Sequence, residues 1–153
     1  MKGQKAYLKA SLISGKLYQY PSTLSTSEKS DLYEEYFTLI KKAAYLGHVE
    51  GQYDLAQQYE DMSFLGIENP MYNPKKCVLW YTKACDNDHA EACNNLAAFY
   101  ESGAGCKKDL ATALKLYEKS SRLGSPNGRK NHKTMLRDMS PDGKYWGRDV
   151  FAD

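Results

Sequence analysis

The chain has 153 residues, of which 42% are hydrophobic and 26% charged, and its formal net charge is +2. Its 21 basic and 19 acidic residues are spread along the sequence without a basic stripe, which argues against a nucleic-acid partner. No apolar run approaches the roughly 18 residues of a membrane span, so we expect a chain without a membrane segment that builds one moderate core.

The N-terminal part predicts two helices with a long connection. The first runs from Lys5 to Ser14 and ends at Gly15. A stretch rich in Ser, Thr and Pro follows, from Tyr18 to Ser27, and the second helix begins near Glu28. Lysine and glycine residues interrupt any apolar core of a signal peptide at this end.

The middle of the chain contains one pattern twice. Residues 51–59 return as residues 92–100, a shift of 41, and residues 76–85 return as residues 112–121, a shift of 36. The earlier copy therefore carries five additional residues, within an insertion at residues 61–74. Repetition at this period is typical of helical solenoids, in which each unit packs only on its neighbours.

Weaker copies flank the two clear ones. The shift of 41 places residues 39–44 on residues 80–85, and Pro126–Met139 stands where a further first helix should lie, with His132 in place of the expected leucine. We therefore predict a single domain in 1–153 with a C-terminal cap. Its units are expected at about residues 4–47, 48–88 and 89–124, and its cap and tail at 125–153.

Each unit is predicted to be a helical hairpin. In the third unit, apolar residues recur at steps of three and four, which places them on one face of each helix. Gly103 and Gly105 break the chain between the two helices, and Asp109 can cap the second. The apolar positions are Cys93, Leu96, Ala97 and Tyr100, followed by Leu110, Ala113, Leu114 and Tyr117.

The order Leu-Ala-x-x-Tyr-x-x-Gly-x-Gly, followed by Asp, Ala, aromatic-Tyr, Lys-Ala-Ala and Gly, resembles the Sel-1-like repeat, a relative of the tetratricopeptide repeat. The likeness is strong over residues 90–125, moderate over 48–89 and weak in the outer units. It implies an all-α fold, a right-handed α-solenoid of stacked antiparallel helix hairpins. It also implies an adaptor that holds a partner in its concave groove.

Two of the four cysteines stand eight positions apart, one at the end of a predicted helix and the other at the start of the next. The pair, Cys85 and Cys93, is similar to the Cys-x7-Cys bridge of the cysteine-rich branch of this family, whose members are typically exported. A disulfide is therefore expected, and it would place the chain in the periplasm or outside the cell after loss of a signal. Two reduced, buried thiols in a cytoplasmic protein remain the alternative. Cys77 and Cys106 are expected in the core.

His89 lies between these two cysteines, three residues from each, so a zinc site is a further alternative. His48 occupies the equivalent position of the preceding unit without flanking thiols. We therefore expect both histidines to have a structural role at the turns between units. The sequence predicts no metal site and no cofactor.

The resemblance to tetratricopeptide repeats implies that first helices line the groove and that residues between the packing positions point into it. An alternative is that these residues only form solvated helix faces. The insertion is a second candidate contact surface, because Phe64 and Ile67 are more apolar than a free loop requires, although it could pack on its own unit. The predicted groove residues are Tyr53, Gln57, Glu60, Asn94, Ala98, Glu101, Lys130 and Arg137.

No spacing links a nucleophile, a base and an orienting group, so we expect no enzymatic activity. Gly103–Lys108 superficially resembles a phosphate loop but lacks its Gly-x4-Gly-Lys-Ser/Thr pattern. We predict an adaptor for a protein or peptide, for example an inhibitor or immunity-type partner of a bacterial enzyme or effector. Two alternatives are a cell-envelope module that binds a glycan or small ligand in the groove, and a cytosolic regulatory scaffold.

Overall fold

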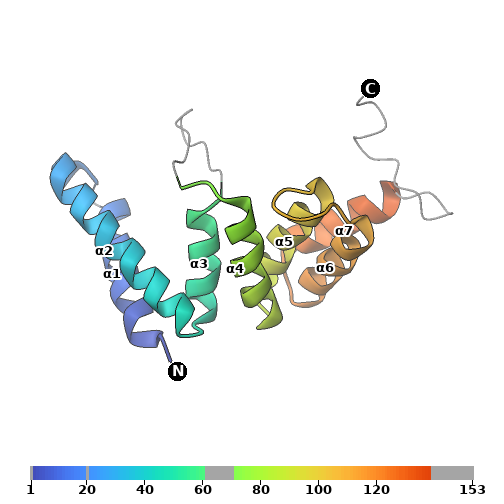
Figure 1. The fold of residues 1–153 in the computed structure, drawn as a ribbon, viewed down its shortest axis with the longest axis horizontal. Helices are drawn as coiled ribbons and strands as arrows, with labels where there is room; N and C mark the ends of the chain where they lie inside the picture. Colours follow the sequence, from blue (N-terminus) through green and yellow to red (C-terminus); the bar gives the residue numbers. More distant parts are fainter. Residues whose placement is uncertain (1, 20, 61–70, 139–153) are drawn as a thin grey trace.

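The computed structural model describes residues 2–19, 21–60 and 71–138. These residues form α-helices and one short 3-10 helix, which follow one another along the long axis of the molecule from α1 to α7 (Figure 1). The predicted α-solenoid of stacked helix hairpins is thereby confirmed. The elements are α1 (Gln4–Gln19), η1 (Pro21–Thr23), α2 (Thr26–Tyr45), α3 (Val49–Gln58), α4 (Pro74–Asp86), α5 (Ala90–Ser102), α6 (Leu110–Arg122) and α7 (Pro126–Asp138).

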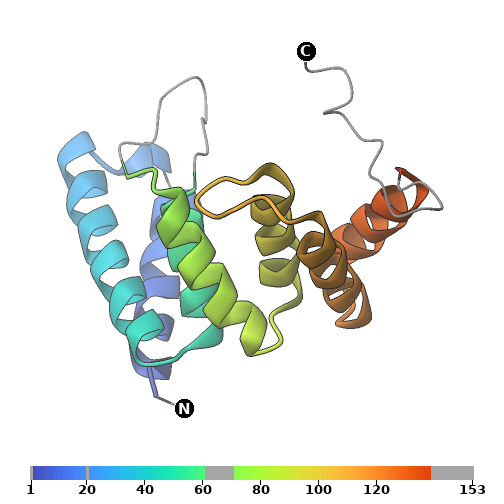
Figure 2. The same cartoon turned by 45° about the vertical axis from the view of Figure 1, so that its right-hand side comes forward.

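The helices alternate between two roles. We call α1, α3, α5 and α7 the first helices and α2, α4 and α6 the second helices. Each first helix packs against the second helix that follows it, and each second helix packs against the next first helix. Figures 1 and 2 show the same order from two directions, with consecutive helices side by side. The first-helix face and the second-helix face are therefore distinct surfaces.

The core runs along the stack in two clusters. The larger joins α1 to α5 and contains Ile40, Leu55 and Tyr81, each fully buried. The smaller joins α5, α6 and α7 through Ala97, Ala113, Tyr117 and Met135. Met135 anchors the capping helix α7, whereas His132, at the position of the expected leucine, is only partly buried.

The first helix is longer than predicted. It passes through Gly15 and ends at Gln19, so that Tyr18 is helical and the connection to α2 is short. A Cβ at Gly15 would meet nothing within 4 Å, and Leu17 beyond it packs on the core. Packing of α1 on α2 thus outweighs the roughly 1 kcal/mol that glycine costs a helix. The second helix starts at Thr26, two residues before the predicted Glu28, because Ser25 and Glu28 form a capping box.

The turn between α5 and α6 matches its prediction. Gly103 ends α5 in the left-handed conformation with φ of 79°, and Asp109 caps α6 by accepting a hydrogen bond from the Thr112 amide at 3.0 Å. Gly105 also has a positive φ, 69°, and a Cβ there would lie 2.4 Å from the carbonyl carbon of Pro74. The turn can therefore rest on the start of α4 only with glycine at this position.

Only the end of the predicted insertion at 61–74 belongs to the described residues. Met71 packs on the core, Tyr72 is exposed, and Asn73 caps α4, which begins at Pro74. Phe64 and Ile67 lie outside the described residues, as does the tail at 140–153. Within the described ranges, no helix has the length and apolarity needed to cross a membrane.

Candidate functional site

Histidines begin two of the first helices. The Nδ1 atom of His48 accepts a hydrogen bond from the Gly51 amide at 3.2 Å, and Nδ1 of His89 accepts one from the Ala92 amide at 3.1 Å. Each imidazole thereby satisfies a backbone amide that has no partner within its helix. The predicted structural role of both histidines is confirmed.

A tyrosine of the preceding first helix stacks on each of these histidines. The Tyr7 ring lies on His48 with centroids 4.2 Å apart, and the Tyr53 ring lies on His89 at 4.3 Å. Burial lowers the pKa of His89, which favours the neutral ring that the cap requires. The stacked pairs thus fix one first helix against the start of the next.

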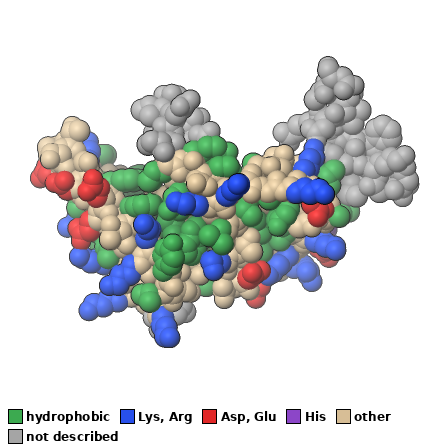
Figure 3. Space-filling model, in the orientation of Figure 1, with side chains coloured by type: hydrophobic (Ala, Val, Ile, Leu, Met, Phe, Trp, Pro, Cys, Tyr) green, Lys and Arg blue, Asp and Glu red, His purple; other side chains and the backbone are tan. Residues whose placement is uncertain are grey.

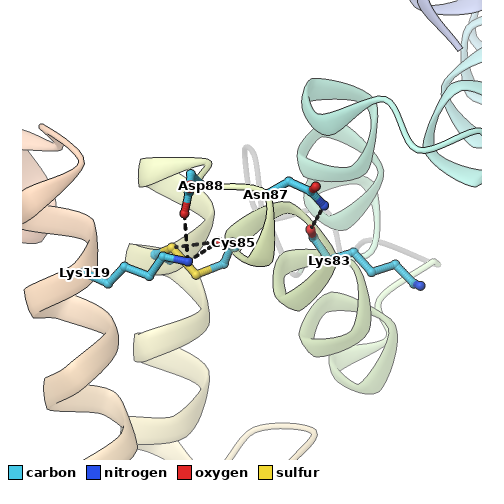
Figure 4. A network of polar contacts seen from close by, with 6 residues as sticks. Lys83, Cys85, Asn87, Asp88 and Lys119 are labelled. Atoms are coloured by element: carbon cyan, nitrogen blue, oxygen red, sulfur yellow. Dashed lines mark hydrogen bonds and ion pairs between the residues drawn. A yellow bond between two sulfur atoms is a disulfide. The ribbon is translucent and has the colours of Figure 1, made fainter. Parts of the chain in front are cut away.

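The predicted pair Cys85 and Cys93 forms a disulfide, with Cα atoms 4.8 Å apart. It joins the last turn of α4 to the first turn of α5. Lys119 of α6 extends this junction, because its Nζ donates to the Cys85 carbonyl at 2.7 Å and pairs with Asp88 at 3.0 Å (Figure 4). The bridge takes up both thiolates that a zinc ion would need beside His89. Three successive helices therefore meet at one covalent and ionic junction.

The two remaining cysteines differ in their burial. Cys77 is fully buried, and its Sγ donates to the Ala56 carbonyl at 3.6 Å. Burial raises the pKa of this thiol to about 12. Cys106 is only partly buried, although it packs on the core and burial also raises its pKa. The prediction of a core position is thus confirmed for Cys77 and holds in part for Cys106.

Tyrosines of the second helices hold two of the predicted groove residues. The Tyr81 hydroxyl of α4 donates to the carboxylate of Glu60, and the Tyr117 hydroxyl of α6 donates to Oε2 of Glu101 at 2.8 Å. Glu60 and Glu101 occupy equivalent positions of consecutive units, as do Tyr81 and Tyr117. We call these contacts the tyrosine–glutamate pairs. Each one fixes the direction of a carboxylate at the end of a first helix.

The other predicted groove residues differ in how far they reach solvent. Gln57 donates through Nε2 to the Tyr53 hydroxyl at 3.1 Å, and both side chains are partly buried. Asn94 is only 9% exposed, and its Oδ1 accepts a hydrogen bond from Asn131 of α7 at 2.9 Å. Arg137 is exposed at the far end of α7. The expectation that these side chains point into a groove therefore needs correction at Asn94, which joins two first helices from a buried position.

Ala98 and Lys130 complete the predicted set. Both are exposed, Ala98 on α5 and Lys130 on α7. Ala98 also lines an open hollow of about 250 Å³ with Glu60, where α5 faces the end of α3. The hollow has room for a side chain of a partner beside a fixed carboxylate.

One polar contact on the first helices had no signal in the sequence. The Tyr7 hydroxyl of α1 interacts with the carboxylate of Asp54 on α3. Burial, the lowering effect of Tyr7 and the raising effect of the nearby Glu50 charge together raise the pKa of Asp54 to about 6, with burial as the largest cause. Because the two residues belong to different units, only packing brings them together.

The described residues contain no cluster of three or more His, Cys, Asp and Glu side chains arranged to hold a metal ion. The first-helix face instead carries hydrogen-bonded polar groups that are fixed in place by their neighbours. Such a surface can bind other molecules through directed hydrogen bonds and charge.

The sequence pattern of the Sel1 repeat matches residues 49–89 and 90–125. Among curated proteins, rat DAP3-binding cell death enhancer 1 is 27% identical over 121 residues, which cover 77% of this chain and 21% of that protein. Cytochrome c oxidase assembly factor 7 of Xenopus tropicalis is 42% identical over 59 residues, 38% of this chain and 26% of that protein. The chain thus spans about a fifth to a quarter of the length of these relatives.

Known structures show the same fold. A Sel1 repeat protein from Oxalobacter formigenes superposes with a TM-score of 0.66 at 23% identity, covering 86% of this chain and 90% of the other. Helicobacter pylori cysteine rich protein B gives a TM-score of 0.58 at 24% identity, covering 84% and 93%. Proteins built from Sel1 repeats generally mediate protein–protein interactions. With two consecutive repeats matched over half of its length, this chain belongs to the Sel1 repeat family.

Proposed function

We propose that this protein is a nonenzymatic adaptor whose first helices bind a protein or an extended peptide. The tyrosine–glutamate pairs are the observation that carries this proposal. They present Glu60 and Glu101 in fixed orientations on consecutive units. A carboxylate can accept several hydrogen bonds, so the tyrosine orients it while it can still accept from a partner.

The charge along the first helices suits a polar partner. Glu60 and Glu101 place acidic groups on α3 and α5, whereas α7 carries four exposed cations, namely Arg129, Lys130, Lys133 and Arg137. A partner segment with basic groups at one end and acidic groups at the other would match this order. The surface between the charged ends is held in place by Tyr53, Gln57 and Asn94. In this proposal, the partner also contacts Phe64 and Ile67 of the insertion at 61–74.

The stacked tyrosines support a protein partner over a glycan. Sugar binding commonly uses a free aromatic face, but Tyr7 and Tyr53 each have one ring face against a histidine. Hydrogen bonds hold the polar side chains of the first helices, some to one another and others to tyrosines of the second helices, which supports a binding surface rather than a catalytic one. One concrete form of this adaptor is an inhibitor or immunity-type protein that covers the surface of a bacterial enzyme or effector.

The double variant Glu60→Gln/Glu101→Gln tests the proposal. Glutamine still accepts a hydrogen bond from each tyrosine but removes the charge. We expect the wild-type protein to capture a protein partner from a native lysate, with and without reductant, and the variant to lose it while its thermal unfolding is unchanged.

A matched control uses two exposed glutamates of the second helices, Glu34→Gln/Glu118→Gln, which should retain the partner. Equal capture by both double variants would contradict a role for the first-helix face. Specific retention of a sugar or metabolite, with no protein captured, would contradict the adaptor itself.

A further inference from the structure

Two pairs of aromatic rings, which we together call the aromatic seam, lie on α2, the end of α3 and α4. It consists of Phe37, Tyr45, Tyr59 and Trp80. The Phe37 ring stands edge-on to Tyr59 with centroids 6.1 Å apart, and Tyr45 stands edge-on to Trp80 at 5.0 Å. Tyr59 and Trp80 are buried, whereas Tyr45 is 73% exposed. The seam therefore offers a buried aromatic floor with one projecting ring.

Three lysines lie over the seam. The Nζ of Lys76 is 4.6 Å from the centre of the Tyr59 ring, and those of Lys41 and Lys83 are 5.6 Å and 5.8 Å from the rings of Phe37 and Trp80. Cation–π attraction favours these ammonium positions. The ion pairs found among the described residues use other cations of the chain. Within that part of the structure, the three charges are thus available to an anion.

The surroundings of the seam are strongly basic. Residues 36–45 and 74–86 together contain five lysines and a single carboxylate, Asp86, although the whole chain has a net charge of only +2. Figure 3 shows hydrophobic side chains gathered over the middle of this face with Lys and Arg side chains around them, while Asp and Glu side chains lie away from it. These two segments are therefore more positive than the chain as a whole.

Apolar side chains on the same helices are also exposed. Leu79 of α4 is 50% exposed, and Leu46, which ends α2, is 43% exposed beside Tyr45. Exposed apolar residues within a cationic rim are complementary to a segment that carries carboxylates around an apolar side chain.

We propose that the aromatic seam is a second docking surface, which binds an acidic peptide segment of a protein partner. Carboxylates of the segment pair with Lys41, Lys76 and Lys83, and one aromatic or leucine side chain lies on Tyr45 and Leu79. Apart from Tyr59, which ends α3, the residues of this surface belong to the second helices α2 and α4, whereas the first-helix face is built on α3, α5 and α7.

An anionic membrane would also attract these lysines, but the geometry favours a peptide. Proteins that bind the membrane interface insert projecting aromatic and aliphatic side chains below the lipid headgroups. Trp80 is only 4% exposed and Tyr59 only 8%, and both rings lie beneath lysine side chains. The two rings cannot reach a lipid acyl region without unfolding of the seam.

Short random peptides displayed on phage, selected against the folded protein, provide the probe. We expect the selected peptides to combine an acidic excess with an aromatic or leucine residue, and to bind more weakly as salt rises. The charge reversal Lys41→Glu/Lys83→Glu should weaken the best peptide by about tenfold or more. Leu79→Ala should weaken it through lost apolar contact, without any change of charge.

The control Lys5→Glu/Lys115→Glu makes the same change of charge at exposed positions of α1 and α6. It should alter the affinity less than about threefold, because charges beyond a Debye length are screened. Glu60→Gln/Glu101→Gln should leave peptide binding intact, which separates this surface from the first-helix face.

Three results would overturn the proposal. The first is selection of peptides without an acidic excess, or of none at all. The second is equal weakening by the two charge reversals, both confirmed as folded by circular dichroism. The third is binding of phosphatidylserine vesicles that the acidic peptide does not displace.

Discussion

Tyr53 and His89 lie face to face, with ring centroids 4.3 Å apart and planes 19° apart, and the histidine caps the next first helix. The same relationship recurs between Tyr7 and His48. Because Nδ1 of His48 accepts from the Gly51 amide, its Nε2 carries the proton and donates to Gln4 at 3.0 Å. A tyrosine–histidine contact thus sets the register between neighbouring units.

Replacement of His89 should weaken this register. His89→Ala removes a helix cap and an aromatic contact, so we expect the free energy of unfolding to fall by about 2 kcal/mol. His89→Asn supplies a side-chain oxygen that can cap the helix but has no ring. Its free energy of unfolding should therefore fall by roughly half as much. Urea unfolding of the three proteins measures both effects. Equal losses in the two variants would show that the ring contributes nothing beyond the cap.

The same residue predicts a loss of stability in mild acid. The folded pKa of His89 lies below its ordinary value of 6.5, so the unfolded chain takes up the proton first. The contribution of His89 to the free energy of unfolding is complete above about pH 6.5, and it is lost as the pH falls through the lower pKa of the folded state. His89→Asn should therefore unfold with a weaker dependence on pH below neutrality than the wild type. If the free energy of unfolding changed equally with pH in the two proteins, the lowered pKa of His89 would be contradicted.

The contribution of Asp54 to stability should change with pH in the opposite direction. Its folded pKa is raised from 3.8 to about 6, so the folded state holds the proton longer than the unfolded chain. This contribution is present below pH 3.8 and is lost as the pH rises through about 6. Asp54→Asn should therefore raise the melting temperature at pH 7.5 and change it little at pH 4, whereas Asp31→Asn, at an exposed position, should have no such trend. A stabilisation that is independent of pH would contradict this account.

The disulfide should contribute measurably to stability. Closing the short loop between Cys85 and Cys93 corresponds to about 2 to 3 kcal/mol in the chain-entropy model. Reductant should lower the free energy of unfolding of the wild type by this amount and leave Cys85→Ala/Cys93→Ala unchanged. If reductant did not change the free energy of unfolding of the wild type, the disulfide would not stabilise the fold.

Two glycines in helices should respond oppositely to alanine. A Cβ at Gly128 would lie 2.1 Å from Oγ of Ser120, which is fully buried and bonded to the Ala90 carbonyl. Gly128→Ala must separate α6 from α7 and should cost about 1 to 3 kcal/mol. At Gly15 a Cβ meets nothing, so Gly15→Ala should stabilise by about 0.5 to 1 kcal/mol. Thermal unfolding that moved in one direction for both variants would contradict these packing assignments.

The periodic pattern of the sequence was sufficient to predict the fold, because the apolar positions of each helix recur in every unit. It also placed Cys85 and Cys93 at adjacent helix ends, where the structure has a disulfide. The pattern could not show that α1 continues past Gly15, since this depends on contacts of Leu17 with another helix.

The candidate site was less predictable from the sequence. The resemblance to tetratricopeptide repeats implied that Glu60 and Glu101 are groove positions but gave no sign of the hydroxyls of Tyr81 and Tyr117 that hold them. It also placed Asn94 in the groove, whereas Asn131 holds this side chain in a buried position. Hydrogen bonds between helices depend on side-chain direction and on packing between units, which a list of spacings does not contain.

Amide hydrogen exchange of the protein, alone and bound to a partner captured from lysate, tests the central proposal most directly. If the first helices bind that partner, protection should increase in α3, α5 and α7 around Glu60, Glu101 and Arg137, and Glu60→Gln/Glu101→Gln should abolish the change. Protection confined to the second helices, or unchanged by this double variant, would contradict the assignment of the first-helix face.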